Sequence, residues 1–393
     1  MLSASIPEVE DRYLARTYQR YPVVVVRGYG ATLWDAEGKA YIDCMGGYGV
    51  ALVGHCHPHV VAAVKRQLEK LITCHCSLYN DARAYFLEKF SRVLPWRHGR
   101  VFLCNSGAEA VECALKLARR YTGRPGVVAM MRGYHGKTMG ALSATWSEKY
   151  RKPFQPLLPH FSFVPYGKVD AVKEALTDEV GAVIVEPIQG ESGVIIPPDE
   201  YLKELRELCD SRDVLLICDE IQCGLGRTGR FWASEHWGVV PDIICAAKGL
   251  AGGIPMGVAA ARADIMEALK LGEHTSTFGG NPLACSAASA VIDVLLGERL
   301  PERARKLGEK FLELLREAVE GLPSVREVRG LGLMLAIELR RHVRGPLMKC
   351  LKDGVIALYS GMNVIRLLPP LVIEEEQVEK AAQVIGSALM AED

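Results

Sequence analysis

Three short apolar runs of the sequence each end in residues that could take part in chemistry. The first run, 101–105, is followed by Ser106 and then by an apolar-periodic stretch that ends at Gly123, as expected for a strand followed by a helix. Free backbone amides at such a helix start, together with the Ser106 hydroxyl, form a site suited to an anion. Ser106 could also serve only as the helix N-cap, a position that favours serine.

The other two runs end in charged side chains. The run 215–218 ends in Asp219 and Glu220, and the run 242–247 ends in Lys248. Carboxylates at a strand end belong either to a structural pair or to a functional site. A lysine at a strand end can extend to solvent, but an ammonium that stays buried there is costly without a partner or a purpose.

Taken together, the three strand ends predict a site for pyridoxal 5'-phosphate. The helix start would hold the phosphate, Lys248 would form the Schiff base, and Asp219 would keep the pyridine nitrogen protonated, so that the ring withdraws electrons. Free lysine has a pKa of about 10.4, so burial has to lower the pKa of Lys248 before it can act as a nucleophile and base. We therefore predict that Lys248 and Asp219 are catalytic.

Two other patterns compete with this interpretation. Residues 224–229 have the glycine spacing of a dinucleotide-binding loop, but they open no apolar-periodic helix and no later strand ends in the required acid. A NAD-dependent dehydrogenase is thus a distant alternative. Histidines and cysteines cluster at 55–59 and 74–76, but neither cluster repeats a ligand pair at zinc-finger spacing, so we predict no metal site.

The composition favours a small molecule as the main partner. The 47 basic and 47 acidic residues cancel, which favours neither nucleic acid nor an anionic membrane. The start has no basic region followed by an apolar core, and no uncharged apolar run reaches the roughly 18 residues of a membrane span. The 12 cysteines are scattered, so most should be buried thiols. We expect a cytoplasmic protein.

The order of apolar runs predicts an α/β fold with two domains. Strand-like runs alternate with helical stretches from about 51 to 261, which indicates a large, doubly wound, mostly parallel sheet with ligands at the carboxyl ends of its strands. We place an N-terminal segment at 1–50, packing with the small domain, a large cofactor-binding domain at 51–275, and a smaller α+β domain at 276–393. The expected strands of the large domain are 101–103, 127–130, 182–185, 214–218, 243–246 and 258–261.

Six short motifs follow one another along nearly the whole chain. They are Asn-Ser-Gly-Ala-Glu at 105–109, Tyr-His-Gly-Lys-Thr at 134–138, Glu-Pro-Ile-Gln-Gly-Glu at 186–191, Asp-Glu-Ile-Gln at 219–222, Ala-Lys-Gly at 247–249, and Ser-Thr-Phe-Gly-Gly-Asn-Pro at 276–282. In these residues the chain resembles the class III aminotransferases of pyridoxal-phosphate fold type I, and within them the acetylornithine aminotransferase group. Several ordered motifs at matching spacing make this resemblance specific.

The resemblance implies a role for each matching residue at the cofactor. Gly107 and Ala108 would hold the phosphate, Tyr134 would stack on the ring, Asp219 would pair with the pyridinium, and Gln222 would touch the phenolic oxygen. Thr277 would reach the phosphate of the neighbouring subunit's cofactor, so the family's homodimer would share its active sites. The full set of implied cofactor-binding residues is Ser106, Gly107, Ala108, Tyr134, Asp219, Glu220, Ile221, Gln222, Lys248 and Thr277.

The resemblance also implies substrate-binding residues. Arg366 would grip the α-carboxylate of glutamate by a two-point contact, and Glu186 matches an acid that masks this arginine when the other substrate binds. Ser276 would lie near the neighbouring subunit's substrate. The family usually has arginine where this chain has Lys137, which keeps the charge but loses the planar grip on a substrate carboxylate. Tyr134 replaces the commoner phenylalanine, which should preserve stacking.

Three stretches point to a particular acceptor within the group. Residues 145–154, 191–193 and 364–373 look most like enzymes that work on the carrier protein LysW. The resemblance then implies ping-pong transfer between glutamate/2-oxoglutarate and a LysW-linked aminoadipate or glutamate semialdehyde, in lysine and possibly arginine biosynthesis. An N-acetylornithine aminotransferase, whose substrate carries an acetyl mask instead, is the first alternative. A pyridoxal-phosphate aminomutase or decarboxylase, or a non-catalytic carrier-binding protein, also stays open.

Overall fold

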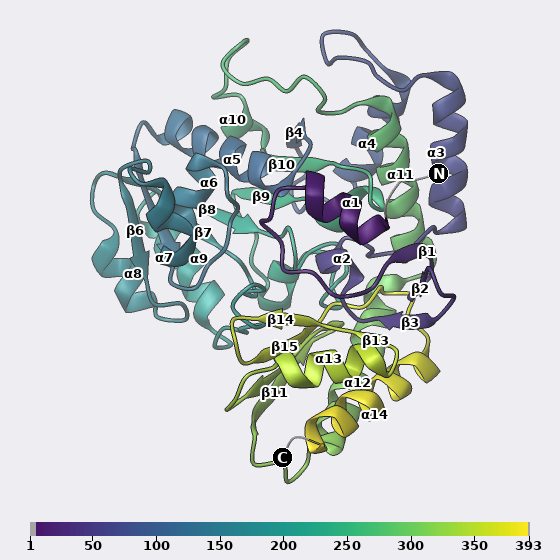
Figure 1. The fold of residues 1–393 in the computed structure, drawn as a ribbon. Coiled ribbons are helices and arrows are strands. Elements are labelled where there is room, and N and C mark those ends of the chain that lie inside the picture. The colour runs from purple at the N-terminus through teal and green to yellow at the C-terminus, as the bar shows by residue number, and fades with distance from the viewer. Residues whose placement is uncertain (1–4, 392–393) are drawn as a thin grey trace.

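The computed structural model describes residues 5–391, and its largest feature is a seven-stranded sheet (Figure 1). The strand order is β4-β10-β9-β8-β7-β5-β6. The strands are β4 (Gly99–Cys104), β5 (Gly126–Met130), β6 (Phe161–Val164), β7 (Val180–Val185), β8 (Leu215–Asp219), β9 (Ile243–Ala246) and β10 (Gly257–Arg262). Only the two pairs that include β10 are antiparallel. The predicted mostly parallel sheet is confirmed.

Two strands of this sheet differ from the expectation. The run 258–261 lies within β10, which is antiparallel to β9. The segment between these strands is too short for the crossover of about a dozen residues that a parallel pair needs. Strand β6 was not expected from the sequence; it pairs on only one side, at the edge of the sheet.

Helices cover both faces of the large sheet (Figure 1). In β9, Ile243 and Cys245 join the core cluster that contains α5 (Gly107–Thr122), whereas Ile244 and Ala246 join the cluster that contains α11 (Pro282–Gly297). A strand that is buried on both faces needs a continuous apolar run. This is why the strands could be recognised as short uninterrupted apolar segments.

The remaining helices surround this sheet and the C-terminal sheet. They are α1 (Ile6–Tyr13), α2 (Gly46–Gly49), α3 (Pro58–Lys70), α4 (Asp81–Ser91), α6 (Met139–Ala144), α7 (Glu148–Arg151), α8 (Val169–Ala175), α9 (Tyr201–Ser211), α10 (Ala263–Met266), α12 (Leu300–Ala318), α13 (Arg344–Lys352) and α14 (Glu375–Met390). Short 3-10 turns are η1 (Lys152–Phe154), η2 (Ala233–Trp237) and η3 (Lys248–Ala251). Among the described residues, no helix is both long and apolar enough to cross a membrane.

Two four-stranded sheets complete the fold. The first has the order β1-β2-β3-β13 and consists of β1 (Val25–Tyr29), β2 (Thr32–Asp35), β3 (Ala40–Asp43) and β13 (Val355–Ile356). The second is antiparallel, has the order β11-β12-β15-β14, and consists of β11 (Val325–Leu331), β12 (Met334–Leu339), β14 (Leu358–Ser360) and β15 (Val364–Leu367). The parallel β3–β13 pair joins the N-terminal segment to the C-terminal part of the chain.

The C-terminal half of the chain also contacts the large sheet's helices. Helix α11, which we assigned to the small domain, packs against α3, α4 and η3. The division into three parts therefore remains a proposal. Helix α11 could be assigned to either the large or the small domain. All 12 cysteines are free thiols, and nine of them are buried.

Candidate active site

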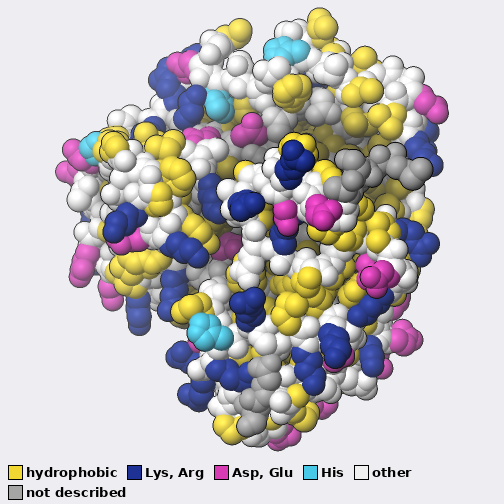
Figure 2. Space-filling view, in the orientation of Figure 1, with side chains coloured by type: hydrophobic (Ala, Val, Ile, Leu, Met, Phe, Trp, Pro, Cys, Tyr) yellow, Lys and Arg dark blue, Asp and Glu magenta, His cyan; other side chains and the backbone are white. Residues whose placement is uncertain are grey.

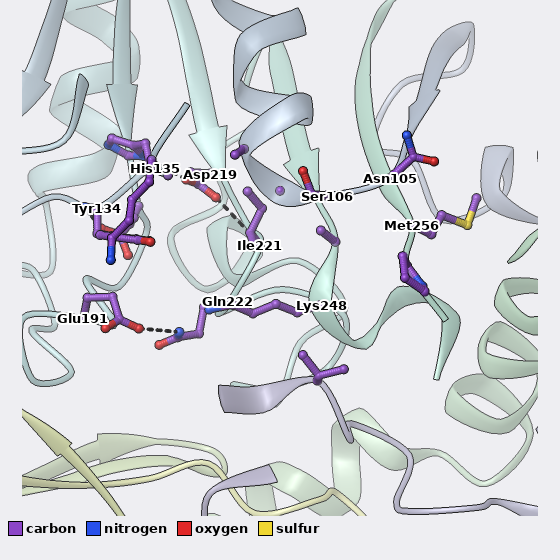
Figure 3. Close-up of a pocket in the computed structure, with 18 of the residues that line it drawn as sticks. Asn105, Ser106, Tyr134, His135, Glu191, Asp219, Ile221, Gln222, Lys248 and Met256 are labelled. Carbon is purple, nitrogen blue, oxygen red and sulfur yellow. Dashed lines mark hydrogen bonds and ion pairs between the residues drawn. The ribbon is translucent and has the colours of Figure 1, made fainter. Parts of the chain in front are cut away.

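A cavity of about 400 Å³ lies at the carboxyl ends of β4, β5, β7, β8 and β9 (Figure 3). This is where open α/β sheets bind ligands. Ten of the predicted site residues line it: Ser106, Gly107, Ala108, Tyr134, Lys137, Glu186, Asp219, Ile221, Gln222 and Lys248. Four predicted residues do not line it, namely Glu220, Ser276, Thr277 and Arg366.

The start of α5 provides a place for an anion at one end of the cavity. Ser106 is the N-cap, and its hydroxyl accepts a hydrogen bond from the Glu109 amide at 3.2 Å, so the capping role is present. The first amides of a helix have no partner within the helix, and Gly107 and Ala108 both line the cavity. A Cβ added to Gly107 would lie 2.8 Å from Ile221 Cδ1, so glycine permits the close approach of this loop.

Asp219 lies deep in the cavity and is held in place by His135. Asp219 Oδ2 is 2.7 Å from His135 Nδ1, and Oδ1 accepts a hydrogen bond from the Ile221 amide at 3.1 Å (Figure 3). Burial opposes a charge on His135, but the hydrogen bond to Asp219 and the negative charges of Asp219 and Glu186 together outweigh it and raise the pKa of His135. His135 belongs to the motif at 134–138, but the residue type and spacing there predict no role for it.

Lys248 begins η3 directly after β9, and its side chain lies in the cavity. Its backbone has φ 45°, a left-handed conformation that costs a non-glycine residue about 1–3 kcal/mol and is concentrated at functional sites. Burial lowers the pKa of Lys248; the carboxylate of Glu191 opposes this shift and the charge of Arg366 adds to it. The lowered pKa favours the neutral amine, which is the form that acts as nucleophile and base.

Arg366 is fully buried and pairs with an acid other than the one we expected. Its Nη1 lies 3.0 Å from Glu191 Oε1 and 3.1 Å from Gln222 Oε1. Glu186 instead accepts hydrogen bonds from the backbone amides of Tyr134 (2.8 Å) and Gly190 (3.1 Å). The expectation that Glu186 masks Arg366 is therefore corrected, because the loop after β7 turns before Glu191 and directs that side chain toward the arginine.

Gln222 lies between Glu191 and Lys248 in the cavity (Figure 3). Its Nε2 donates to Glu191 Oε1 at 3.4 Å, so its amide links the two partners of the ion pair. Two nitrogens of Arg366, Nε and Nη2, have no hydrogen-bond partner among the described residues. A buried guanidinium with unpaired donors can bind a carboxylate at little desolvation cost, because its own nitrogens are already out of water.

The expectation that Glu220 contacts the cofactor is also corrected. Successive residues of a strand point to opposite faces, so Glu220 points away from the cavity that Asp219 lines. Its two oxygens accept the backbone amides of Ala233 and Ser234, each at 2.8 Å. Burial raises the pKa of Glu220 to about 7, although both amides oppose the shift. Glu220 is a structural carboxylate rather than a cofactor contact.

Ser276 and Thr277 lie on the loop before α11, outside the cavity of their own chain. Ser276 Oγ accepts hydrogen bonds from Asn105 Nδ2 at 3.2 Å and from the Gly279 amide at 3.0 Å. Thr277 is exposed. A role for Thr277 at a cofactor thus requires a second copy of the chain.

Lys137 and two tyrosines line or border the mouth of the cavity. The Lys137 ammonium lies 4.5 Å from the centroid of the Tyr150 ring, a cation–π contact. Tyr134 meets the same ring edge-on, with centroids 6.0 Å apart. Burial raises the pKa of Tyr134 to about 12, so its hydroxyl stays protonated. No local pattern predicts the contact of Tyr150 with Lys137, because the two residues are 13 positions apart on different elements.

The cavity residues fit pyridoxal phosphate. The α5 amides lie where a phosphate would be bound, Asp219 is a buried carboxylate that can pair with the ring nitrogen, and Lys248 is a buried amine whose pKa is lowered. The sequence did not reveal that Val50, Asn105 and the segment 253–256 also line the cavity. Asn105 ends the run 101–105 but is uncharged, and no apolar run or charged strand end marks Val50 or the segment 253–256.

Comparison with known proteins agrees with this geometry. The class III aminotransferase family matches residues 13–389. The chain is 50% identical to an acetylornithine aminotransferase of Methanopyrus kandleri over 98% of both chains, and 44% identical to a [LysW]-aminoadipate semialdehyde transaminase of Deinococcus radiodurans over 94% of this chain and 87% of the relative. Its structure resembles the ornithine aminotransferase of Toxoplasma gondii, with a TM-score of 0.94, 39% identity, and coverage of 98% and 94% of the two chains. The chain belongs to the class III aminotransferases and is a pyridoxal-phosphate-dependent transaminase.

Proposed function

We propose that the enzyme moves an amino group between glutamate/2-oxoglutarate and the terminal semialdehyde of an amino acid whose α-amine is masked. The observation that carries this proposal is the buried Arg366, which pairs with Glu191 through Nη1 and has two nitrogens without a hydrogen-bond partner among the described residues. Glutamate has a carboxylate that can take the place of Glu191, whereas the masked substrate needs none there. Pyridoxal phosphate, when bound, would hold the amino group between the two half-reactions.

Each cavity residue has a proposed task. Lys248 would hold the cofactor covalently and, when released, move the proton at the substrate carbon that bears the amino group. Asp219, positioned by His135, would keep a proton on the ring nitrogen. Tyr134 would stack on the ring and Gln222 would donate to its phenolic oxygen. The phosphate would be held by Ser106, Gly107 and Ala108, and Ile221 would pack on the ring.

The mask on the second substrate is proposed to be the LysW carrier protein. The sequence stretches 145–154, 191–193 and 364–373 favour this assignment, and relatives named for LysW-linked substrates are among the similar proteins. The enzyme would then serve lysine biosynthesis, and possibly arginine biosynthesis. Lys137 would meet a carboxylate of this substrate at the mouth of the cavity, beside Tyr150.

N-acetylornithine is the second candidate substrate. Six of the similar proteins, which are 42–50% identical, carry the name acetylornithine aminotransferase. Both substrates present a terminal amine or semialdehyde and a masked α-amine. A carrier-linked glutamate semialdehyde differs from the N-acetylated substrate only in the mask, whereas the aminoadipate derivative also has one more methylene between the α-carbon and the reacting carbon. A comparison of kcat/KM for free N-acetylornithine and for the carrier-linked amino acid would separate the two assignments.

We also propose that the enzyme is a homodimer with shared active sites. Exposed apolar side chains gather on two loops, between α3 and α4 and before α11: Leu71, Ile72, Leu78, Tyr79, Leu271 and Phe278. Figure 2 shows hydrophobic side chains at the top of the molecule, where Figure 1 places these loops. Exposed Thr277 and half-buried Ser276 lie on the second loop, so a partner seated there would receive them near its cofactor.

The test of the proposed function is the absorption of the purified holoenzyme. Glutamate should bleach the yellow band of the lysine-bound cofactor, and a semialdehyde acceptor should restore it. Borohydride reduction before glutamate is added, followed by peptide mapping, should label Lys248. Lys137 is the internal control, because it is the other lysine that lines the cavity. A label on Lys137, or a band that glutamate leaves unchanged, would contradict the proposal.

A further inference from the structure

The loop that carries Glu191 has a strained tip. Its base is closed by hydrogen bonds between Gln189 and Ile195, each at 3.0 Å. At the tip, Gly193 has φ 98° and Val194 has φ 57°. A β-branched residue is rarely found in the left-handed region, and such strain persists only where the surrounding structure holds it in place.

Arg329 of β11 holds this tip. Its Nε donates to the carbonyls of Gly193 (3.0 Å) and Val194 (3.1 Å), and its Nη2 donates to the Gly193 carbonyl at 2.7 Å. Its Nη1 lies 2.7 Å from the carboxylates of both Glu327 and Glu338. The guanidinium is buried, and its planar fork is thus fixed by acids on one side and by the strained carbonyls on the other.

Arg329 and Arg366 lie in one row of the C-terminal sheet. Arg329 is paired with Ala336 across β11 and β12, and Ala336 is paired with Arg366 across β12 and β15. Residues that are directly opposite in an antiparallel sheet point to the same face. The two arginines therefore face the same loop, and the small side chain of Ala336 lies between them.

The contacts of this sheet face confirm that the loop packs on it. A Cβ added to Gly193 would lie 3.1 Å from Val364 and 3.2 Å from Arg329 Nη2. The Ser360 hydroxyl donates to the Glu191 carbonyl. The sheet therefore holds the loop backbone at Glu191 itself and two residues further along, at Gly193.

We infer that Arg329 is a positioning residue that sets how firmly Glu191 masks Arg366, and thereby the balance between the two substrates. This inference rests on the proposed roles of Glu191 and Arg366. With the tip held, Glu191 competes with a substrate carboxylate for Arg366 and neutralises the buried guanidinium when the other substrate is bound. With the tip loosened, a substrate carboxylate binds Arg366 more readily. When no substrate carboxylate is bound, the charge of Arg366 is less well neutralised by Glu191.

The variant Arg329→Lys tests this inference, because lysine keeps the charge but cannot contact both carbonyls and both acids at once. Its matched control is Arg326→Lys. Arg326 lies on the same strand and pairs with the other oxygen of Glu338 at 2.9 Å, but it is exposed and does not contact the loop. Thermal unfolding of both variants shows that they are folded before any comparison is made.

The first readout is the binding of glutarate, a dicarboxylate that cannot react, to the holoenzyme by titration calorimetry. Arg329→Lys should tighten glutarate binding about fivefold, because the contact between Glu191 and Arg366 that competes with glutarate is weakened. Fivefold is the factor that corresponds to about one typical hydrogen bond. The second readout is the ratio of kcat/KM for glutamate to that for N-acetylornithine, which should rise by a similar factor. Arg326→Lys should change neither quantity.

A double-mutant comparison shows whether Arg329 acts through Glu191. Glu191→Gln alone should tighten glutarate binding, and Arg329→Lys should add nothing in that background. The positioning role would be overturned if Arg329→Lys left the glutarate affinity unchanged. It would also be overturned if Arg329→Lys changed that affinity equally in the wild type and in the Glu191→Gln variant. An Arg366→Gln variant that binds glutarate as wild type does would instead overturn the proposed function, because the carboxylate would then lie elsewhere.

Discussion

At the scale of single residues, Asp219 and Glu220 are adjacent acids in different surroundings. Asp219 faces the cavity and His135, whereas the oxygens of Glu220 are taken by backbone amides. The first acid can act on a bound ring, and the second can only hold the backbone between β8 and η2. The structure thus provides a matched pair of substitutions that separate chemistry from stability.

We predict that Asp219→Asn lowers kcat by a factor of about 10² to 10³, as is typical when a charge aimed at the transition state is lost. Glu220→Gln should leave kcat of the folded enzyme within about twofold but cost about 1–3 kcal/mol in the free energy of unfolding, because an amide cannot accept both backbone donors. Steady-state kinetics and chemical denaturation of both variants check this. Loss of turnover in Glu220→Gln with normal stability would reverse the assignment.

At the scale of elements, the start of α5 and the segment after β8 fit together without space between them. Gly107 opens the helix whose amides would hold the phosphate of the cofactor, and its absent side chain leaves room for Ile221. The start of α5 and the end of β8 are thus held at a fixed separation. This separation sets the distance between the α5 amides, which would hold the phosphate, and Asp219, which would pair with the ring nitrogen.

We predict that Gly107→Ala weakens the binding of pyridoxal phosphate about tenfold, since overpacking costs about 1–3 kcal/mol. The added Cβ would lie 2.8 Å from Ile221 Cδ1, and the second substitution Ile221→Val removes that methyl group. Fluorescence titration of the cofactor-free variants should show partial recovery in Gly107→Ala/Ile221→Val. The absence of recovery would mean that the glycine is needed for its backbone rather than for contact with Ile221.

In the whole molecule, the side chains of Tyr79 and Phe278 are exposed on neighbouring loops that Arg83 links through the carbonyls of Leu78 and Gly280. Large contiguous apolar surfaces mark interaction sites. The exposed Thr277 lies beside Phe278, so the same contact that covers the apolar loops would complete a second active site. Assembly and activity should therefore be lost together.

We predict that Tyr79→Glu or Phe278→Glu yields a monomer with little transaminase activity, because a buried unpaired carboxylate costs several kcal/mol at an interface. Val240→Glu is the control; Val240 is also exposed but precedes β9, at the end of the strand opposite the cavity. Light scattering and turnover report the two properties. An active monomer would remove the proposed role of Thr277.

The mostly parallel sheet and the residues at its strand ends could be predicted from the order of residues alone. Lys248 and Asp219 could be located because a strand buried on both faces must be a continuous apolar run. The charged residue that follows such a run can then be read directly from the sequence. The start of α5 was recognisable for the same reason, since the change from a strand to an amphipathic helix is local. Strand β10 could be located but not its direction, which depends on the length of its connection.

The acid that pairs with Arg366, and the acids that face the cavity, depend on long-range packing and could not be predicted from the sequence. Glu186 and Glu191 lie on one loop, and the turn at its tip, held by Arg329, determines that Glu191 reaches the arginine. The alignment of Arg329, Ala336 and Arg366 comes from strand register between segments that are distant in the sequence. Side-chain direction and register depend on long-range pairing, which no local pattern of residue types encodes.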